Sequence, residues 1–308
     1  MSEENPIIKL GLFLNRESRA VYLLVFIICF AGALYPISLP NKPATQWVQN
    51  FYNEIEKLKP GDVVFMVWAL AGGDRADFAN INGLVYQIWS KQAGILNWVI
   101  SAETQTWMDT VFYQPLLGVD GTAAEKTAPL YGTQWVDLGY LPSTREAVTY
   151  GAASNLRTLV ASRDKFGTNL DSLPMMGPSA AHPNGVNKAT DFALVISVGS
   201  GGPPAVWTVP IGAFYLAYGV PCIGTGEGET YTEAAYLVQC GLEKGFAGAL
   251  WGSRMYEQLV VDKLGISTDT AIGSTKSVST QVFYVGMFVV IAMIAHNVYS
   301  LGMKRKGD

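Results

Sequence analysis

Histidine and cysteine are scarce in this sequence, which limits the chemistry open to it. The 308 residues include only two histidines and three cysteines. His182 is the one histidine outside the two long apolar runs described below, and no cysteine and histidine have the spacing of a zinc site. We therefore expect neither a metal site nor a cofactor. Cys222 and Cys240 could form a disulfide in an oxidising compartment, but unpaired buried thiols are the favoured prediction.

Charged residues are also few, at 15% of the chain against about 25% in ordinary soluble domains. Two long runs, residues 20–38 and 282–301, contain no Asp, Glu, Lys or Arg. A transmembrane helix needs about 20 largely apolar residues, so both runs are predicted to span a membrane. The first also resembles a signal peptide with small residues at 31–33. Its apolar run continues beyond them, which favours an uncleaved anchor.

Basic residues flank both runs on their outer sides. Arg16 and Arg19 precede the first, and Lys304, Arg305 and Lys306 follow the second. The positive-inside rule therefore predicts a two-pass protein of the cell membrane, with both tails cytoplasmic and the main domain extracytoplasmic. The first tail is neutral and the second carries +2, so a chain of net charge −4 has −6 between the runs. This acidity argues against nucleic acid as a partner and against a domain surface built to bind anionic lipid. The lipid bilayer is an expected partner because of the two apolar runs.

Between these runs, short apolar stretches alternate with amphipathic ones. Continuous apolar strands separated by helices of about 10–20 residues are typical of an α/β fold with an open, mostly parallel, Rossmann-like sheet and helices on both faces. The predicted strands are residues 63–70, 97–101, 135–140, 192–198 and 221–224. The predicted helices are 45–58, 80–92, 104–114, 143–162, 206–218, 231–242 and 246–264.

Two helix starts have recognisable caps. Thr45 is expected to cap an amphipathic helix that packs on the domain or lies at the membrane surface, and Ser143 with Glu146 forms a capping box. The predicted parts of the chain are a cytoplasmic tail (1–19), a transmembrane helix (20–38), a linker with the amphipathic helix (39–59), the α/β domain (60–264), a second linker (265–281), a transmembrane helix (282–301) and a basic cytoplasmic tail (302–308).

Three glycine-rich segments follow predicted strands. Their possible ligand contacts are Gly72, Gly73, Asp74, Gly199, Ser200, Gly201, Gly226 and Glu227. Ligands of open parallel sheets bind beyond the carboxyl ends of the strands, and glycine lets backbone N–H groups approach them closely. None of the segments has the G-x-G-x-x-G pattern or a P-loop lysine, so nucleotide binding is not predicted. Tight turns alone also explain these glycines.

The sequence contains no recognisable catalytic set. It has no G-x-S-x-G elbow and no Ser–His–Asp set with a suitable histidine. The acidic pairs Glu227/Glu229 and Asp74/Asp77 are better explained as solvated loop ends than as acid–base groups. No catalytic residue is therefore assigned, and an enzyme is the less favoured class.

Four glycines near the end of the domain recur at helical spacing. Gly241, Gly245, Gly248 and Gly252 are separated by four, three and four residues. If one helix ran through all of them, they would form a smooth face for close packing, inside the domain or at a subunit contact. Packing inside the domain is favoured, because glycine within a helix costs about 1 kcal/mol and needs such a reason.

Two stretches give the chain a resemblance to a known family. They are residues 135–140, Trp-Val-Asp-Leu-Gly-Tyr, and the stretch from Tyr236 through the last three of those glycines to Glu257. The chain resembles an uncharacterised family of bacterial membrane-anchored proteins that carry an α/β domain between transmembrane spans. The resemblance covers residues 131–259 and implies the same architecture, but no activity and no catalytic residue.

These observations predict a membrane-anchored scaffold or accessory subunit of a larger membrane assembly, which acts through its extracytoplasmic α/β domain. Besides the bilayer, the expected partners are further copies of the chain or other membrane proteins. The alternative is a small-solute receptor or enzyme that uses the glycine-rich loops at the strand ends.

Overall fold

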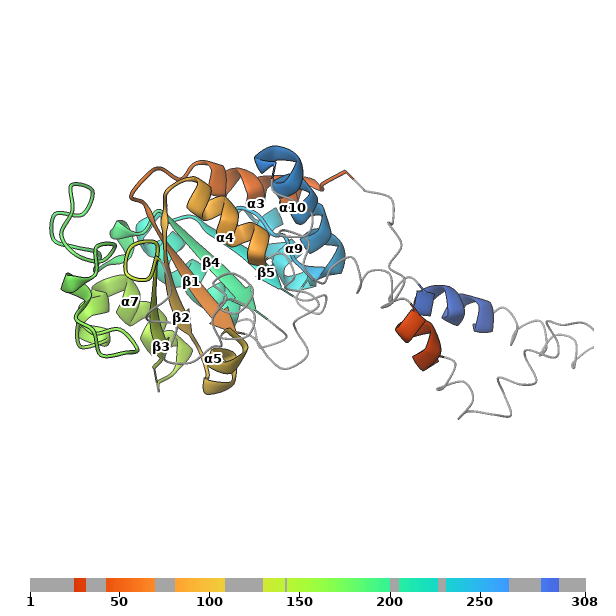
Figure 1. Cartoon of the computed structure of the whole chain (residues 1–308), viewed down its shortest axis with the longest axis horizontal. Helices are drawn as coiled ribbons and strands as arrows, with labels where there is room; N and C mark the ends of the chain where they lie inside the picture. Colours follow the sequence, from red (N-terminus) through yellow and green to blue (C-terminus); the bar gives the residue numbers. More distant parts are fainter. Residues whose placement is uncertain are drawn as a thin grey trace, which may run out of the picture. The chain divides into compact units, whose positions relative to one another are not determined.

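Five parallel strands form one sheet in the order β3-β2-β1-β4-β5 (Figure 1). The computed structural model describes residues 25–31, 43–69, 81–108, 130–141, 143–199, 205–226, 231–265 and 284–293. The strands are β1 (Val63–Ala69), β2 (Gly94–Val99), β3 (Trp135–Tyr140), β4 (Leu194–Gly199) and β5 (Cys222–Gly226). The predicted α/β class and parallel sheet are confirmed. The largest difference at a strand start is in β2, which begins at Gly94 rather than Asn97.

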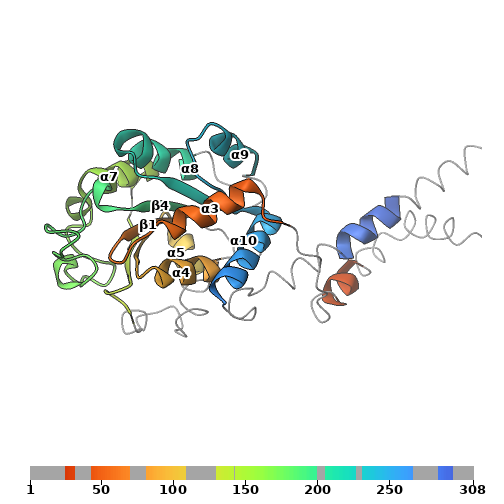
Figure 2. The ribbon, with the colours of Figure 1, turned by 90° about the horizontal axis from the view of Figure 1, so that it is seen from above.

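Helices cover both faces of this sheet, which explains why the strands are apolar along their whole length. All residues of β1, β2, β4 and β5 are buried. Figure 2 shows α7, α8 and α9 along one side of the sheet and α4, α5 and α10 along the other. The helices are α3 (Gln46–Glu56), α4 (Ile81–Ser90), α5 (Ala102–Met108), α7 (Arg145–Leu159), α8 (Ala205–Pro210, continued by a π-helical turn over Ile211–Leu216), α9 (Tyr231–Gln239) and α10 (Ala249–Leu264).

The amphipathic helix α3 is an integral part of the domain. Thr45 caps it as predicted, because its side chain accepts a hydrogen bond from the Val48 N–H at 3.4 Å. Phe51 and Ile55 are fully buried in the same core cluster as one face of the sheet. Of the two predicted roles for this helix, packing on the domain is therefore the one observed, and α3 lies in the same compact unit as the strands, Asn41–Gly273.

Helix α7 is shorter than predicted and has a different cap. Thr144, not Ser143, adopts the extended cap conformation, and its hydroxyl accepts from the Ala147 N–H at 3.2 Å. The capping box at Ser143 is therefore wrong by one residue. Asn155 has φ −160° and interrupts the helix, while its side-chain oxygen accepts from the Thr158 N–H at 3.0 Å.

One helix does not run through the four glycines, because α9 ends at Gln239 and α10 begins only at Ala249. The chain between them runs beside β5: the Gly224 N–H donates to the Gly245 carbonyl at 3.1 Å, and the Ala247 N–H donates to the Gly224 carbonyl at 3.0 Å. An exposed strand edge leaves backbone groups unpaired, and this pairing satisfies them. Close packing inside the domain is nevertheless observed, since a Cβ added to Gly245 would lie 2.6 Å from the Phe51 Cα.

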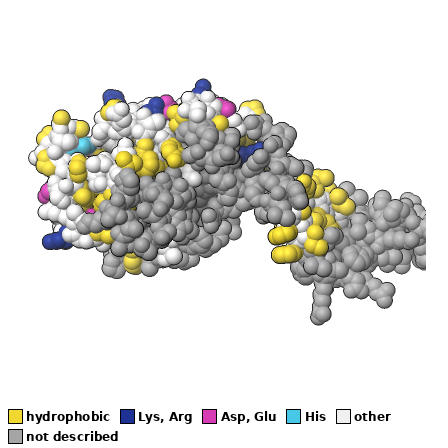
Figure 3. Space-filling view, in the orientation of Figure 1, with side chains coloured by type: hydrophobic (Ala, Val, Ile, Leu, Met, Phe, Trp, Pro, Cys, Tyr) yellow, Lys and Arg dark blue, Asp and Glu magenta, His cyan; other side chains and the backbone are white. Residues whose placement is uncertain are grey.

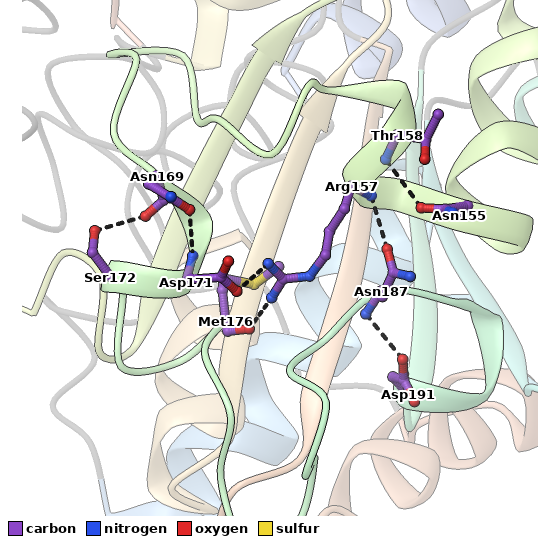
Figure 4. A network of polar contacts seen from close by, with 9 residues as sticks. All are labelled: Asn155, Arg157, Thr158, Asn169, Asp171, Ser172, Met176, Asn187 and Asp191. Atoms are coloured by element: carbon purple, nitrogen blue, oxygen red, sulfur yellow. Dashed lines mark hydrogen bonds and ion pairs between the residues drawn. The ribbon is translucent and has the colours of Figure 1, made fainter.

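The segment between α7 and β4 is irregular, and a polar network holds it in place (Figure 4). The Arg157 guanidinium pairs with the Asp171 carboxylate and donates to the Met176 carbonyl at 2.7 Å. The Arg157 N–H donates to the Asn187 side chain at 2.9 Å, and the Asn187 N–H donates to the Asp191 carboxylate at 2.9 Å. Two 3₁₀ turns lie within the segment, Leu170–Ser172 and Ala189–Asp191.

Parts of both predicted spans are helical, over residues 25–31 and 284–293, in a compact unit separate from the domain. Hydrophobic side chains cover much of their surface (Figure 3), and Phe26 and Met293 are 66% and 60% exposed. Within the stretches of chain described above, no helix reaches the length and apolar character needed to cross a membrane. The rest of the predicted spans, 20–38 and 282–301, lies outside those stretches.

Candidate functional site at the carboxyl end of the sheet

Three strands of the sheet end in register at its carboxyl edge. Ala69 of β1 pairs with Gly199 of β4, and Gly199 pairs with Gly226 of β5. These strand ends lie side by side, and the three glycine-rich segments of the sequence begin at or just after them. The order of the strands also reverses at this place: β2 and β3 lie on one side of β1, and β4 and β5 lie on the other. Open α/β sheets bind ligands in the crevice where the strand order reverses.

Most of the predicted ligand contacts lie outside the described residues. These are Gly72, Gly73, Asp74, Ser200, Gly201 and Glu227. Gly226 has a packing reason for being glycine, because an added Cβ would lie 2.6 Å from the Gly199 carbonyl oxygen and 2.7 Å from the Trp207 ring. The alternative explanation of these glycines, a close approach within the fold, therefore accounts for Gly226, while a ligand-binding role stays a prediction.

Two buried polar residues lie side by side on the neighbouring strands β2 and β3. Asn97 and Asp137 are register partners on neighbouring strands, and both are 0% exposed. The Trp68 indole N–H donates to the Asn97 side-chain oxygen at 2.9 Å. The Asn97 amide nitrogen is buried and has no hydrogen-bond partner among the described residues. A buried donor left unpaired costs about 1–3 kcal/mol.

The Asp137 carboxylate is fully paired and serves the structure. It accepts from the Gly139 N–H at 2.7 Å, from Gln105 at 3.3 Å and from the Lys165 ammonium at 2.8 Å. Gly139 has φ +70° at an irregularity in the β2–β3 pairing, where the extra residue of a bulge needs this conformation. Because the Lys165 N–H also donates to the Asp137 carbonyl at 3.1 Å, the residue ties the irregular segment to the edge strand β3.

Tyr131 and Asp164 form a second paired group beside β3. The Tyr131 hydroxyl donates to the Asp164 carboxylate at 2.6 Å, and Asp164 also accepts from the Phe166 and Thr168 N–H groups at 2.9 and 2.7 Å. Burial, followed by the nearby Asp164 carboxylate, raises the pKa of Tyr131 far above its usual range. This tyrosine therefore stays protonated and is a structural donor rather than a base.

Two glutamates lie close together under the end of β5. Glu243, in the segment between α9 and α10, is 2% exposed, and its second carboxylate oxygen has no hydrogen-bond partner in the described part of the chain. Burial, with a smaller contribution from the Glu233 carboxylate, raises the pKa of Glu243 well above its ordinary value. The Trp207 ring and the Glu243 carboxyl both lie against Gly224. The shift favours the protonated carboxyl, which can donate a hydrogen bond.

The cysteines and histidine add no reactive group. Cys222 is buried, Cys240 is exposed, and both are free, so the disulfide alternative is not formed. Burial raises the pKa of the Cys222 thiol far above its usual range, which suppresses the nucleophilic thiolate. In the described ranges, no three His, Cys, Asp or Glu side chains are grouped as metal ligands would be.

Comparisons with protein-family models, curated proteins and solved structures give no match, so no relative supplies a function for this chain.

Sequence reasoning missed Asn97, Lys165 and Glu243. A polar residue inside an otherwise apolar strand is a usable signal, and it marks both Asn97 and Asp137. Nothing in the local sequence marks Glu243, whose burial depends on the path of the chain beside β5.

Proposed function

We propose that the α/β domain binds a small polar solute over the carboxyl ends of β1, β4 and β5, and that the two apolar runs anchor it to a membrane. The observation that carries the proposal is the in-register ending of these strands at Ala69, Gly199 and Gly226. A glycine-rich segment begins at or just after each of these residues. The order of the strands reverses between β1 and β4, which is where open α/β sheets bind ligands.

The charges around this edge indicate what kind of solute is suitable. The segment after β5 contains Glu227 and Glu229, and the region between the apolar runs carries a charge of −6. These acids would repel phosphate and other anions. An uncharged or cationic polar solute, such as a sugar, polyol, nucleoside or amine, matches these groups.

A melting experiment on the full chain in lipid nanodiscs tests this proposal. All eight tryptophans lie between residues 47 and 251, so tryptophan fluorescence reports on the domain alone. Pools of each solute class are screened for a rise in melting temperature, and hits are confirmed by calorimetry. Asp74→Asn and Glu227→Gln should each weaken binding of a cationic hit at least tenfold. The exposed Glu146→Gln serves as the control and should leave binding unchanged.

Several outcomes would contradict the proposal. If no uncharged or cationic polar solute raises the melting temperature, the proposed site is wrong. If a hit binds equally well to wild type, Asp74→Asn and Glu227→Gln, binding takes place elsewhere on the domain.

A scaffold or accessory-subunit role is the second candidate, and exposed aromatic and aliphatic side chains favour it. Leu216 and Tyr236 are each 65% exposed, and Tyr218 is 48% exposed, at the ends of α8 and along α9. Such groups are common in protein contacts. Mass measurement after mild detergent extraction distinguishes the two candidates: a homo-oligomer or a complex with other membrane proteins favours the scaffold, and a monomer carrying a solute favours the receptor.

A further inference from the structure

An apolar cavity of about 350 Å³ opens between the first turns of α3, α9 and α10. This volume is within the range of about 300–1,000 Å³ that is usual for ligand pockets. Its wall includes Trp47, Tyr231, Phe246, Trp251 and Met255, and none of the described residues that line it carries a charge. The cavity is separate from the glutamates under β5 and from the buried pair in β2 and β3.

Aromatic rings build both the floor and the rim of this cavity. Phe246 is 1% exposed and lies beneath Tyr231, with ring centroids 6.2 Å apart, and Trp47 lies 5.6 Å from Tyr231. At the rim, Tyr231 and Trp251 remain 43% and 42% exposed. Gly248 and Gly252 also line the cavity. The result is a dry floor and a rim of amphipathic rings.

We propose that this cavity takes up the acyl chain of a membrane lipid. Thr45, on its wall, follows the last residue of the predicted span, Ser38, by only seven positions. A fully extended segment of that length reaches at most about 25 Å. The chain that joins the wall of the cavity to the proposed anchor is therefore short.

The composition of the rim supports the same occupant. Tryptophan and tyrosine are enriched at membrane–water interfaces, where the rings lie at the level of the lipid headgroups. An uncharged wall has nothing to offer the headgroup, but it removes a hydrocarbon chain from water. This inference rests on the membrane anchoring proposed above and not on solute binding at the strand ends.

Fluorescence quenching by brominated lipids tests the inference. The full chain is placed in nanodiscs whose lipids carry bromine on the acyl chains, and in matched nanodiscs without bromine. Neither predicted span contains tryptophan, and Trp68, Trp98, Trp135 and Trp207 are at most 1% exposed. All samples carry Trp107→Phe, which removes the other tryptophan whose exposure is not described. Quenching should then arise from the cavity, and adding Trp47→Phe/Trp251→Phe should remove more than half of it. Trp89→Phe, at a partly buried tryptophan on α4, is the control and should keep the wild-type quenching.

Each other result would overturn the inference in a different way. Quenching that survives Trp47→Phe/Trp251→Phe places the lipid contact elsewhere. A chain that enters nanodiscs but shows no quenching keeps its anchor and has an empty cavity, whereas a chain that does not enter them has lost the anchoring itself. Quenching that appears only in nanodiscs with a single chain would mean that a second copy of the chain covers the cavity. That result also contradicts the inference. If the double variant fails to fold, Trp251→Phe alone, at the exposed rim, is used and should lose a measurable part of the quenching.

Discussion

Replacing Glu243 by glutamine should change how the stability of the domain depends on pH. The carboxyl is 2% exposed and faces Glu233, and burial raises its pKa well above the ordinary value of 4.5. A group whose pKa is raised on folding keeps its proton in the folded state and loses it in the unfolded state as pH rises. The stabilisation from this group is therefore complete below pH 4.5 and is lost as pH rises towards its pKa in the folded protein.

The size of the effect follows from proton linkage. One pKa unit corresponds to about 1.4 kcal/mol, so each pH unit above the ordinary value lowers the free energy of unfolding by about that amount while the folded carboxyl stays protonated. Glu243→Gln has nearly the same shape but no proton to release, so its stability lacks this decline. Relative to wild type, the variant should gain stability as pH rises above 4.5, by at most about 1.4 kcal/mol per pH unit.

Urea unfolding followed by tryptophan fluorescence at pH 5, 6 and 7 measures this difference. Glu146→Gln, at an exposed position on α7, is the matched control and should track wild type at every pH. A difference between wild type and Glu243→Gln that stays constant over this range would refute the reasoning. It would mean that the Glu243 carboxyl ionises normally in the folded domain.

Three further outcomes follow from the packing and the predicted topology. Gly248→Leu should lower the stability of the domain by about 1–3 kcal/mol, because even a Cβ would lie 2.5 Å from the Gly226 carbonyl oxygen; unchanged melting would contradict this packing. Lys165→Met should cost about 3–5 kcal/mol, because it leaves the Asp137 carboxylate buried without its cation, and adding Asp137→Asn should recover part of the loss. Ser179→Cys should react with a membrane-impermeant thiol reagent in intact cells, and labelling only after lysis would refute the extracytoplasmic placement.

The buried strands could be predicted from the sequence because their signal is local. In β1 and β4, every residue is apolar or small, since helices on both faces exclude water, and such a run identifies a strand without knowledge of its neighbours. Thr45 is predictable as a helix cap from the sequence, because a helix start depends on the few residues around it. For α7, the sequence predicts Ser143 as the cap and the structure has Thr144. Both residue types are suitable, and only the backbone conformation selects between them.

The sequence by itself therefore determined the class of the fold, the strands and the glycine-rich segments that follow them. Tertiary structure alone decided which of these segments lie together, because the order β3-β2-β1-β4-β5 depends on contacts between distant parts of the chain. Tertiary structure also decided that the four spaced glycines do not lie on one helix. Their spacing is compatible with a helix, but the edge of β5 needs hydrogen-bond partners, and the chain at Gly245 and Ala247 supplies them instead of continuing α9. Glu243 is carried into the core by that same path, where desolvation changes its chemistry.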